Sequence, residues 1–312
     1  MRAARQHGLR ILILWWCVAL FACASTPDVV DVDEGEPLPR GVWEVETGQR
    51  LDFDEFVDRL RAKTYVIVGE SHGTEFHHLV QAEIYGELSG ASAQEVALGM
   101  EMVERRFQEA LDAYAEGRID EAEMLDRVQW EKRWGVDAEF YAPMWRRAYD
   151  DDQPIRGLNA RRELVRAVGE VGVDGLEEEE RAELPDMDTS NEAHREHLRG
   201  IFGAHGAHGE MDEEALDRFF EAQLVWDETM AQTAFEFIEA QGAEQILILT
   251  GRGHMERGFG IPAGLIRRGV VVDEIATVVP VVTEGPRASM MEEYRDLAFL
   301  RDEEIADFVW VE

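Results

Sequence analysis

Short apolar runs alternate with longer stretches of mixed polarity along most of this chain. Short apolar runs that are rich in β-branched residues and end at glycine or polar residues predict buried strands. They cover residues 65–68, 95–102, 154–158 and 245–249, and residues 270–282 hold one or two more. The intervening stretches place apolar residues at helical spacing, as residues 53–60 do. Short strands that alternate with helices predict an α/β fold with a mostly parallel central sheet flanked by helices.

Two of the helical stretches are longer than a connection between parallel strands requires. They lie near residues 103–152 and 176–243, whereas a crossover needs only about a dozen residues. We therefore predict a single domain over residues 42–312 that carries an inserted helical cap subdomain.

The first 22 residues are typical of a bacterial export signal. Three arginines precede an apolar run over residues 11–22, which is shorter than the ~20 residues of a membrane-spanning helix. The run ends in Leu20-Phe21-Ala22-Cys23. This ending resembles the lipobox of bacterial lipoproteins, so Cys23 is the predicted lipidation site. The alternative is an ordinary signal peptide that is cleaved after Ala22 or Ala24.

On the lipoprotein interpretation, residues 1–22 are a signal peptide and residues 23–41 form a flexible acidic tether. Ala24 follows the lipidated cysteine, and the usual sorting pattern then favours the outer membrane, facing the periplasm. Cys17 lies in the removed segment. The folded body therefore has no thiol for a disulfide, a metal site or a nucleophile.

The chain is strongly acidic, with 66 Asp and Glu against 31 Lys and Arg and a net charge of −35. Without the three arginines of the signal peptide the balance is 28 against 66, or −38. This charge opposes binding to nucleic acid, which requires basic surface, and it opposes attraction to anionic lipids. We therefore expect no nucleic-acid partner, and membrane contact through the lipid anchor alone.

One four-residue pattern occurs twice, each time after a predicted strand. Gly69-Glu70-Ser71-His72 follows the strand at 65–68, and Gly251-Arg252-Gly253-His254 follows the strand at 245–249 and Thr250. Ligands of open α/β sheets bind beyond the carboxyl ends of the strands, where glycine lets the backbone approach closely. His72 and His254 are therefore predicted to share one site, as catalytic groups or as ligands of a divalent metal ion.

Charged residues at the same strand ends extend this candidate site. Glu70 and Glu101 lie at the ends of apolar runs, where an unpaired carboxylate would be costly. Both are candidate catalytic groups and, with the two histidines, candidate metal ligands. Arg105 and Arg252 are nearby cations that could hold an anion or the carboxylates. The alternative is that each glutamate forms a structural salt bridge with one of these arginines.

The other histidines are expected to be structural. His77 and His78 fall within a predicted helix, in the core or at the surface, although one of them could face the site. An exposed helix and loop is expected for the polar stretch that holds His194, His197, His205 and His208. The P-loop and the Rossmann fingerprint are absent from the sequence.

Five stretches of the chain resemble, in the same order, the haem-binding uptake family called ChaN, part of the Tiki/TraB/erythromycin-esterase superfamily. They are VIVGESHGTEFHH (66–78), ALGMEM (97–102), IRGLNARRELV (155–165), AQLVWDETMA (222–231) and LILTGRGHMERGFGIP (247–262). His72 and His254 match the paired histidines of that superfamily. Glu70 and Glu101 match its acidic positions, and Arg105 matches its arginine.

The resemblance implies an α/β core with a helical subdomain, in a bacterial lipoprotein that binds haem for iron uptake. It also suggests a homodimer. Haem ligation in this family is attributed to tyrosine, and the candidates here are Tyr85, Tyr114, Tyr141 and Tyr149, with core packing as the alternative for each. Arg252 completes the predicted cofactor-binding set.

The same resemblance allows a metal-dependent hydrolase, either a peptidase or an esterase. In that hypothesis a metal ion on His72, His254 and one glutamate lowers the pKa of bound water toward ~7, and the other glutamate is the general base. A metal-free variant uses one of the histidines as the base. A third hypothesis is a structural or adaptor lipoprotein. We prefer the haem binder over the enzyme.

Overall fold

The computed structural model describes residues 36–90, 95–204, 212–241 and 243–312. The predicted signal peptide, the lipidation site Cys23 and most of the predicted tether lie outside the described residues, as do His205 and His208. Leu38 is fully buried, and its N–H donates to the carbonyl oxygen of Arg295 at 2.7 Å. Leu38 therefore packs with the described body, although it falls within the stretch predicted as a tether.

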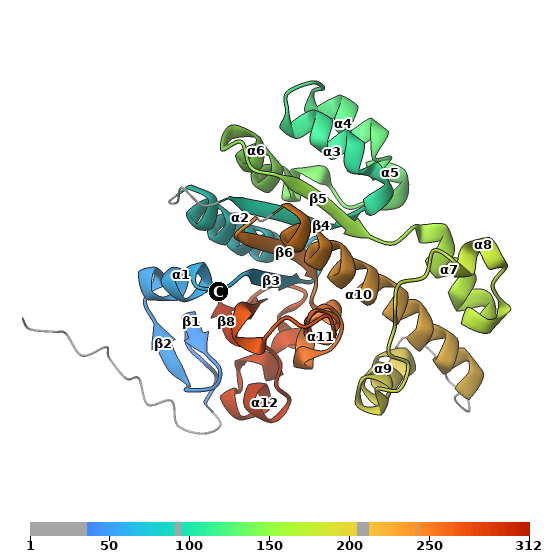
Figure 1. The fold of residues 1–312 in the computed structure, drawn as a ribbon. Helices are drawn as coiled ribbons and strands as arrows, with labels where there is room; N and C mark the ends of the chain where they lie inside the picture. The colour runs from blue at the N-terminus through green and yellow to red at the C-terminus, as the bar shows by residue number, and fades with distance from the viewer. Residues whose placement is uncertain (1–35, 91–94, 205–211, 242) are drawn as a thin grey trace, which may run out of the picture.

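The described residues form one eight-stranded sheet in the order β2-β1-β8-β7-β3-β6-β4-β5. The strands are β1 Gly41–Glu44, β2 Gln49–Leu51, β3 Tyr65–Glu70, β4 Val96–Glu104, β5 Ile155–Asn159, β6 Gln245–Gly251, β7 Ile275–Val281 and β8 Phe308–Val311. Five of the described strand pairs are parallel, and the two pairs made by β1 are antiparallel. The predicted α/β fold with a mostly parallel central sheet is confirmed (Figure 1).

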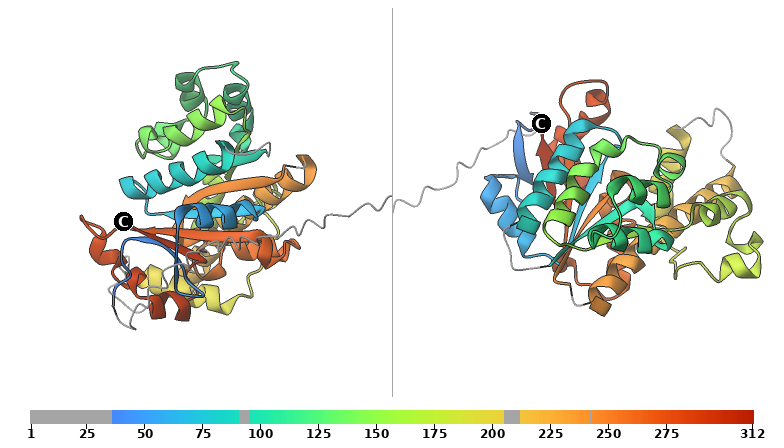
Figure 2. Two further views of the ribbon diagram at one scale, coloured as in Figure 1. Left: turned by 90° about the vertical axis from the view of Figure 1, so that its left-hand side faces the viewer. Right: turned by 90° about the horizontal axis from the view of Figure 1, so that it is seen from above.

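Alternate residues of the strands supply two hydrophobic cores, one on each face of the sheet. Val66 and Val68 of β3 pack with apolar residues from the first helices, whereas Tyr65 and Ile67 pack with residues of the later helices. A strand sends successive side chains to opposite faces, so a strand that is covered on both sides is apolar throughout. Figure 2 shows the helices on both sides of the sheet.

Most of the helices lie in the connections between these strands. They are α1 Phe53–Arg61, α2 Glu75–Gly90, α3 Gln108–Ala115, α4 Glu121–Arg127, α5 Trp130–Arg133, α6 Ala142–Asp150, α7 Arg162–Val171, α8 Glu178–Arg181, α9 Glu192–Ala204, α10 Glu213–Gln241, α11 Ile261–Arg267 and α12 Leu297–Asp302. Helices α3 to α6 lie within the first stretch predicted as an insertion, and α8 to α10 lie within the second. No helix in the described part of the chain is both long and apolar enough to cross a membrane.

The carboxyl-terminal part of the sheet agrees with the sequence prediction in one strand and adds another. The stretch at 270–282, predicted to hold one or two strands, forms one, because residues 272–274 form a 3-10 turn before β7 begins at Ile275. The last strand, β8, was not predicted, since it is a run of only four residues near the end of the chain. It pairs with both β1 and β7 and thereby joins the antiparallel edge to the parallel sheet.

Candidate functional site

A cavity of about 400 Å³ opens at the carboxyl ends of β3, β4, β5 and β6. Its lining residues are His72, Glu101, Met102, Glu104, Arg133, Trp134, Asn159, Ala160, Arg162, Trp226 and His254. Ligand cavities of proteins are typically of about 300–1,000 Å³. The two Gly-x-x-His motifs thus lie where open α/β sheets bind their ligands.

On the β3 side, Glu70 is a buried carboxylate that holds His72 in place. The Nδ1–H of His72 donates to Glu70 Oε1 at 2.6 Å, and the Tyr141 hydroxyl donates to the same oxygen at 2.6 Å. The other carboxylate oxygen lies 3.2 Å from Nδ1 of His78. Burial alone would raise the pKa of Glu70, but the hydrogen bonds to His72 and His78 outweigh it and lower the pKa to about 2.

On the β4 and β6 side, Glu101 is a second buried carboxylate. Its Oε2 accepts hydrogen bonds from the N–H of Gly251 at 2.6 Å and from the hydroxyl of Thr250 at 2.8 Å. Its Oε1 lies 3.4 Å from Nε2 of His254. Burial raises the pKa of Glu101, but the charge of His254 and these hydrogen bonds lower it to about 2.

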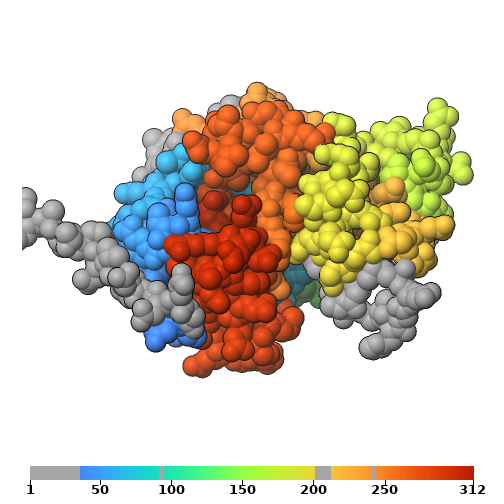
Figure 3. All heavy atoms as spheres, turned by 90° about the horizontal axis from the view of Figure 1, so that it is seen from below, coloured from blue at the N-terminus to red at the C-terminus, as the bar shows by residue number. Residues whose placement is uncertain are grey.

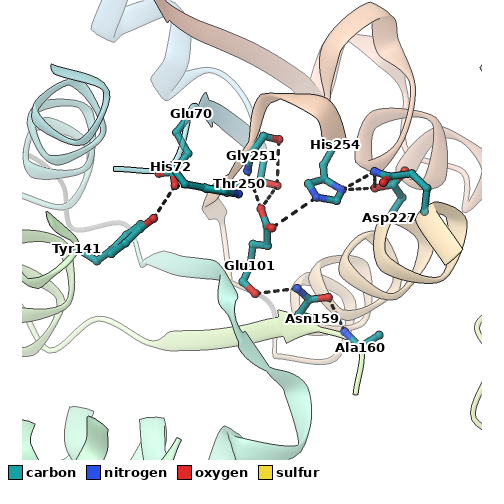
Figure 4. Close-up of polar contacts among 11 residues, drawn as sticks. Glu70, His72, Glu101, Tyr141, Asn159, Ala160, Asp227, Thr250, Gly251 and His254 are labelled. Atoms are coloured by element: carbon teal, nitrogen blue, oxygen red, sulfur yellow. Dashed lines mark hydrogen bonds and ion pairs between the residues drawn. The ribbon is translucent and has the colours of Figure 1, made fainter. Parts of the chain in front are cut away.

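His254 lies between two buried carboxylates. Its Nδ1–H donates to Asp227 Oδ1 at 2.5 Å, while Nε2 faces Glu101 (Figure 4). Burial would lower the pKa of His254, but the charges of Glu101 and Asp227 raise it to about 10, so the ring is an imidazolium at neutral pH. Asp227 comes from α10, the long helix that passes beside the strand ends.

The two histidines meet across Gly251. A Cβ atom at this position would lie 3.0 Å from Cε1 of His72 and 3.5 Å from Cδ2 of His254, so glycine permits both rings to approach. Each ring also has an aromatic neighbour that lines the cavity. Trp134 lies edge-on to His72 at 4.7 Å between ring centroids, and Trp226 lies edge-on to His254 at 6.0 Å.

The structure thus brings four of the predicted site residues together. His72, His254 and Glu101 line the cavity, and Glu70 lies directly behind His72 (Figure 4). Neither glutamate forms the alternative salt bridge with arginine, since both pair with histidine.

The structure does not bring the two predicted arginines into the cavity. Arg105 donates instead to the carbonyl oxygen of Glu183, and Arg252 pairs with Glu256 and lies over the ring of Tyr294. The guanidinium groups at the cavity belong to Arg133 and Arg162. They come from the end of α5 and the start of α7.

The predicted tyrosines do not present their hydroxyls to the cavity. Tyr85 is fully buried and donates to the carbonyl oxygen of Val96, while Tyr114 packs against Tyr149 away from the site. Tyr141 is also buried, and its hydroxyl is bound to Glu70. Tyr149 is 42% exposed but is not among the cavity residues.

Several site residues were not predicted as such from the sequence. Asp227 lies within the stretch 222–231 that resembles the family, and that resemblance is the signal that could have identified it. His78 was expected to be structural, and its ring is buried against Glu70. Trp134 and Trp226 carry no sequence signal beyond their aromatic character.

The geometry gives no support to the predicted metal ligands. Within the described ranges, no group of three or more His, Cys, Asp or Glu side chains is arranged to hold a metal ion. Glu70 in particular directs its carboxylate at two histidines and a tyrosine rather than into the cavity.

Fold and site together define an α/β protein with a ligand cavity between paired histidine–carboxylate clusters. The model of the haem-binding uptake family, Tiki superfamily, ChaN, matches residues 56–265. The chain therefore belongs to this family. A search of curated proteins finds no match.

Several solved structures are similar to this chain. A structure of cofacial haem binding to ChaN of Campylobacter jejuni matches 88% of this chain and 98% of its own, at 20% identity and a TM-score of 0.67. A mutant of the erythromycin esterase EreC in its open conformation matches 78% of this chain and 77% of its own at 12% identity and a TM-score of 0.44. The type III effector HopBA1 matches 79% and 85% at 14% identity and a TM-score of 0.41.

The donor chemistry of the cavity fits a haem group at His72 rather than at a tyrosine. Histidines that bind metal donate their other ring N–H to a carboxylate, and the Nδ1–H of His72 does so with Glu70. Its side chain is 40% exposed at the cavity wall, whereas Tyr85, Tyr114 and Tyr141 are buried and the exposed Tyr149 does not line the cavity. Imidazole is also a common axial ligand of haem iron.

Proposed function

We propose that this chain is an exported haem-binding lipoprotein that serves haem or iron uptake. The observation that carries the proposal is the His72 imidazole, held by Glu70 at the wall of a cavity that contains two tryptophans and two arginines. Bound haem would supply an iron centre, and His72 is the residue that would hold it. Membership of the haem-binding family supports the same proposal.

The cavity residues have distinct tasks in this proposal. Trp134, Trp226 and Met102 provide apolar contact for a flat ring. Arg162 is exposed, and its guanidinium donates to the carbonyl oxygen of Lys132 at 3.0 Å. No carboxylate in the described part of the chain forms an ion pair with it. It is therefore the cation that would hold a propionate.

The lipid anchor at Cys23 and the location on the outer membrane, facing the periplasm, belong to the proposal. They rest on the basic start, the apolar run and the cysteine that ends it. A homodimer in the haem-bound state is a further part of the proposal. Chromatography of the mature chain with and without haem tests the dimer, and labelling with radioactive palmitate tests the anchor.

Haem titration of the chain from Ala24 onward tests the main proposal. We expect a shifted Soret band that saturates near one haem per chain and that His72→Gly abolishes. Added imidazole should restore the band in that variant, because it can occupy the space that the side chain vacates. His197→Gln is the control, since His197 is not among the cavity residues. A wild-type chain without a Soret shift at micromolar haem would remove the proposal.

A second candidate function is hydrolysis, and it rests on a different observation. His254 lies between the buried carboxylates of Glu101 and Asp227, which favour its protonated form, and haem binding does not require this arrangement. A fixed cation of this kind stabilises the oxyanion that forms when a carbonyl is attacked. His72, oriented by Glu70, would take the proton from the attacking water and return it to the leaving group.

Turnover of a panel of esters and peptides tests this second function. The panel is run once with a chelator and once with added divalent metal ions, so that it tests both the metal-free and the metal-dependent form of the hypothesis. We expect His254→Gln to abolish turnover while the shifted Soret band is retained, because His72 is the proposed iron ligand. If the wild-type chain hydrolyses nothing in the panel, the hydrolase proposal fails and the haem proposal stands.

A further inference from the structure

His194, in the first turn of α9, is buried rather than exposed. The polar sequence around it predicts an exposed helix, but only 2% of this residue is accessible to solvent. Helix α9 itself lies at the molecular surface, beside the part of the chain that follows β6 (Figure 3). The helix therefore turns one titratable side chain inward, toward the site.

One contact holds the backbone of His194, and two others fix the orientation of its ring. The backbone N–H of His194 donates to Oδ1 of Asn191 at 3.0 Å, which caps the start of the helix. The ring stacks on Phe259 with 4.8 Å between centroids and an interplanar angle of 14°, and it meets Phe220 edge-on at 5.5 Å. Rotation of the ring would lose both aromatic contacts.

The fixed ring directs Nε2 at Asp227. Nε2 of His194 lies 4.0 Å from Oδ2 of Asp227, and both atoms are buried without a hydrogen-bond partner among the described residues. An unpaired buried polar atom destabilises the folded chain. A donor and an acceptor that face each other at this separation can satisfy each other through a small inward shift of α9 or through one bridging water.

The opposite oxygen of Asp227 is the one that holds His254. Oδ1 accepts from Nδ1 of His254 at 2.5 Å and from the side-chain amide of Gln223 at 3.2 Å. Four side chains thus follow one another from the cavity to α9, in the order Glu101, His254, Asp227 and His194. His197, one turn along α9, also contacts Phe259, but no carboxylate of the described chain lies against it.

We propose that His194 is a positioning residue for His254 and acts through Asp227. Its Nε2–H stabilises the Asp227 anion and fixes the carboxylate in the rotamer that presents Oδ1 to His254. The consequence is a single, lasting hydrogen bond between Asp227 and Nδ1 of His254. The inference rests on the second proposed function, in which His254 is the group that meets the substrate.

Nitrogen-15 and proton NMR of the histidine rings in the mature chain tests this role without any need for turnover. The resonance to follow is the Nδ1 proton of His254 at fixed neutral pH. In His194→Phe, which keeps the stacking on Phe259, we expect this proton to exchange with water about tenfold faster or to disappear, as the loss of one hydrogen bond to a charged group predicts. His194→Gln, which keeps a donor, should retain the resonance.

His197→Phe is the matched control, because it changes the neighbouring histidine on the same helix and should leave the spectrum of His254 unchanged. Urea unfolding of each variant verifies the fold, and His194→Met serves if His194→Phe does not fold. An unchanged His254 resonance in the apolar variant, or an equal change in His197→Phe, would overturn the inference. If the wild-type chain shows no turnover, only the hydrolase proposal fails, because the His254 resonance reports directly on the hydrogen bond between His254 and Asp227.

Discussion

Glu70, Glu101 and Asp227 are almost fully buried carboxylates of the site, but their pKa values are shifted in different directions. Glu101 accepts hydrogen bonds from a backbone N–H and a hydroxyl and faces an imidazolium, and these contacts outweigh the cost of burial. Asp227 has fewer donors, so burial prevails and raises its pKa. At the scale of single residues, the donors around each carboxylate decide in which direction its pKa moves.

Stability in acid should report the charge of Glu101. Its pKa is lower in the folded chain, about 2, than the ordinary 4.5, so it stabilises the fold above about pH 4.5 and loses this contribution as the pH falls toward 2. We expect the stability advantage of the wild type over Glu101→Gln to shrink by about 2–3 kcal/mol between pH 5 and 2. Urea unfolding at stepped pH measures it. For the exposed Glu179→Gln the difference from the wild type should not vary with pH.

Two buried tyrosines allow a matched comparison of hydrogen-bond strength. The Tyr141 hydroxyl donates to a carboxylate at 2.6 Å, whereas the Tyr85 hydroxyl donates to a neutral carbonyl oxygen at 3.3 Å. We expect Tyr141→Phe to lower the free energy of unfolding by about 2 kcal/mol and Tyr85→Phe by about 1 kcal/mol. Equal losses in urea unfolding would mean that the charge of Glu70 does not strengthen its bond to Tyr141.

At the scale of elements, the turn that joins β6 to α11 forms one wall of the site. Gly260, at the start of α11, has a φ of +60°, and a Cβ atom there would lie 2.3 Å from the carbonyl oxygen of His254 and 3.1 Å from Cγ of Asp227. The backbone therefore packs directly against the His254–Asp227 pair. Gly258 also has a positive φ, +66°, but a Cβ atom there would meet nothing within 4 Å.

This contrast predicts unequal effects of two alanine substitutions. Gly258→Ala should cost about 1 kcal/mol from backbone strain alone. Gly260→Ala adds a clash with backbone that cannot move freely, so we expect a loss of about 3 kcal/mol or more. Thermal and urea unfolding of the two variants measures the difference. A Gly260→Ala chain as stable as Gly258→Ala would show that the turn can relax.

At the scale of the whole molecule, the ends of the chain complete the sheet. β8, near the carboxyl terminus, lies between β1, near the amino terminus of the folded body, and β7 of the parallel sheet. Phe308, Val309 and Val311 are buried, and Phe308 packs edge-on against Phe56 of α1. The first and last elements of the described chain are therefore parts of one cooperative unit.

A chain that ends at Asp307 lacks β8 and should no longer fold as one cooperative unit. Removal of β8 leaves two unpaired strand edges and detaches β1 and β2, and we expect the thermal midpoint to fall by more than about 10 °C or the chain to aggregate. Removal of Glu312 alone is the control: it deletes only the hydrogen bonds of that residue to Val281 and Thr283 and should lower the midpoint far less. Circular dichroism during heating provides the measurement. A truncated chain with the wild-type midpoint would show that the hairpin folds against the core without β8.

The periodicity of apolar residues along the sequence predicts much of this architecture. Runs of apolar residues predict the strands at 65–68, 95–102, 154–158 and 245–249, and all four are present in the structure with slightly extended ends. The position of both Gly-x-x-His motifs after parallel strands placed His72 and His254 at one edge of the sheet. These inferences succeed because strand periodicity and strand-end position depend on neighbouring residues alone.

The pairing within the site was decided only by the tertiary structure. Tyr141 lies 71 positions from Glu70, and Thr250 lies 149 positions from Glu101. Nothing in the sequence near Asp227 shows that it faces His254, and nothing near Arg105 shows that it turns to Glu183 instead of the cavity. Such contacts arise when helices and strands that are distant along the chain pack together. The sequence alone therefore identified the two histidines together with Glu70 and Glu101, while packing decided which histidine each glutamate meets and added Asp227 and the arginines of the cavity.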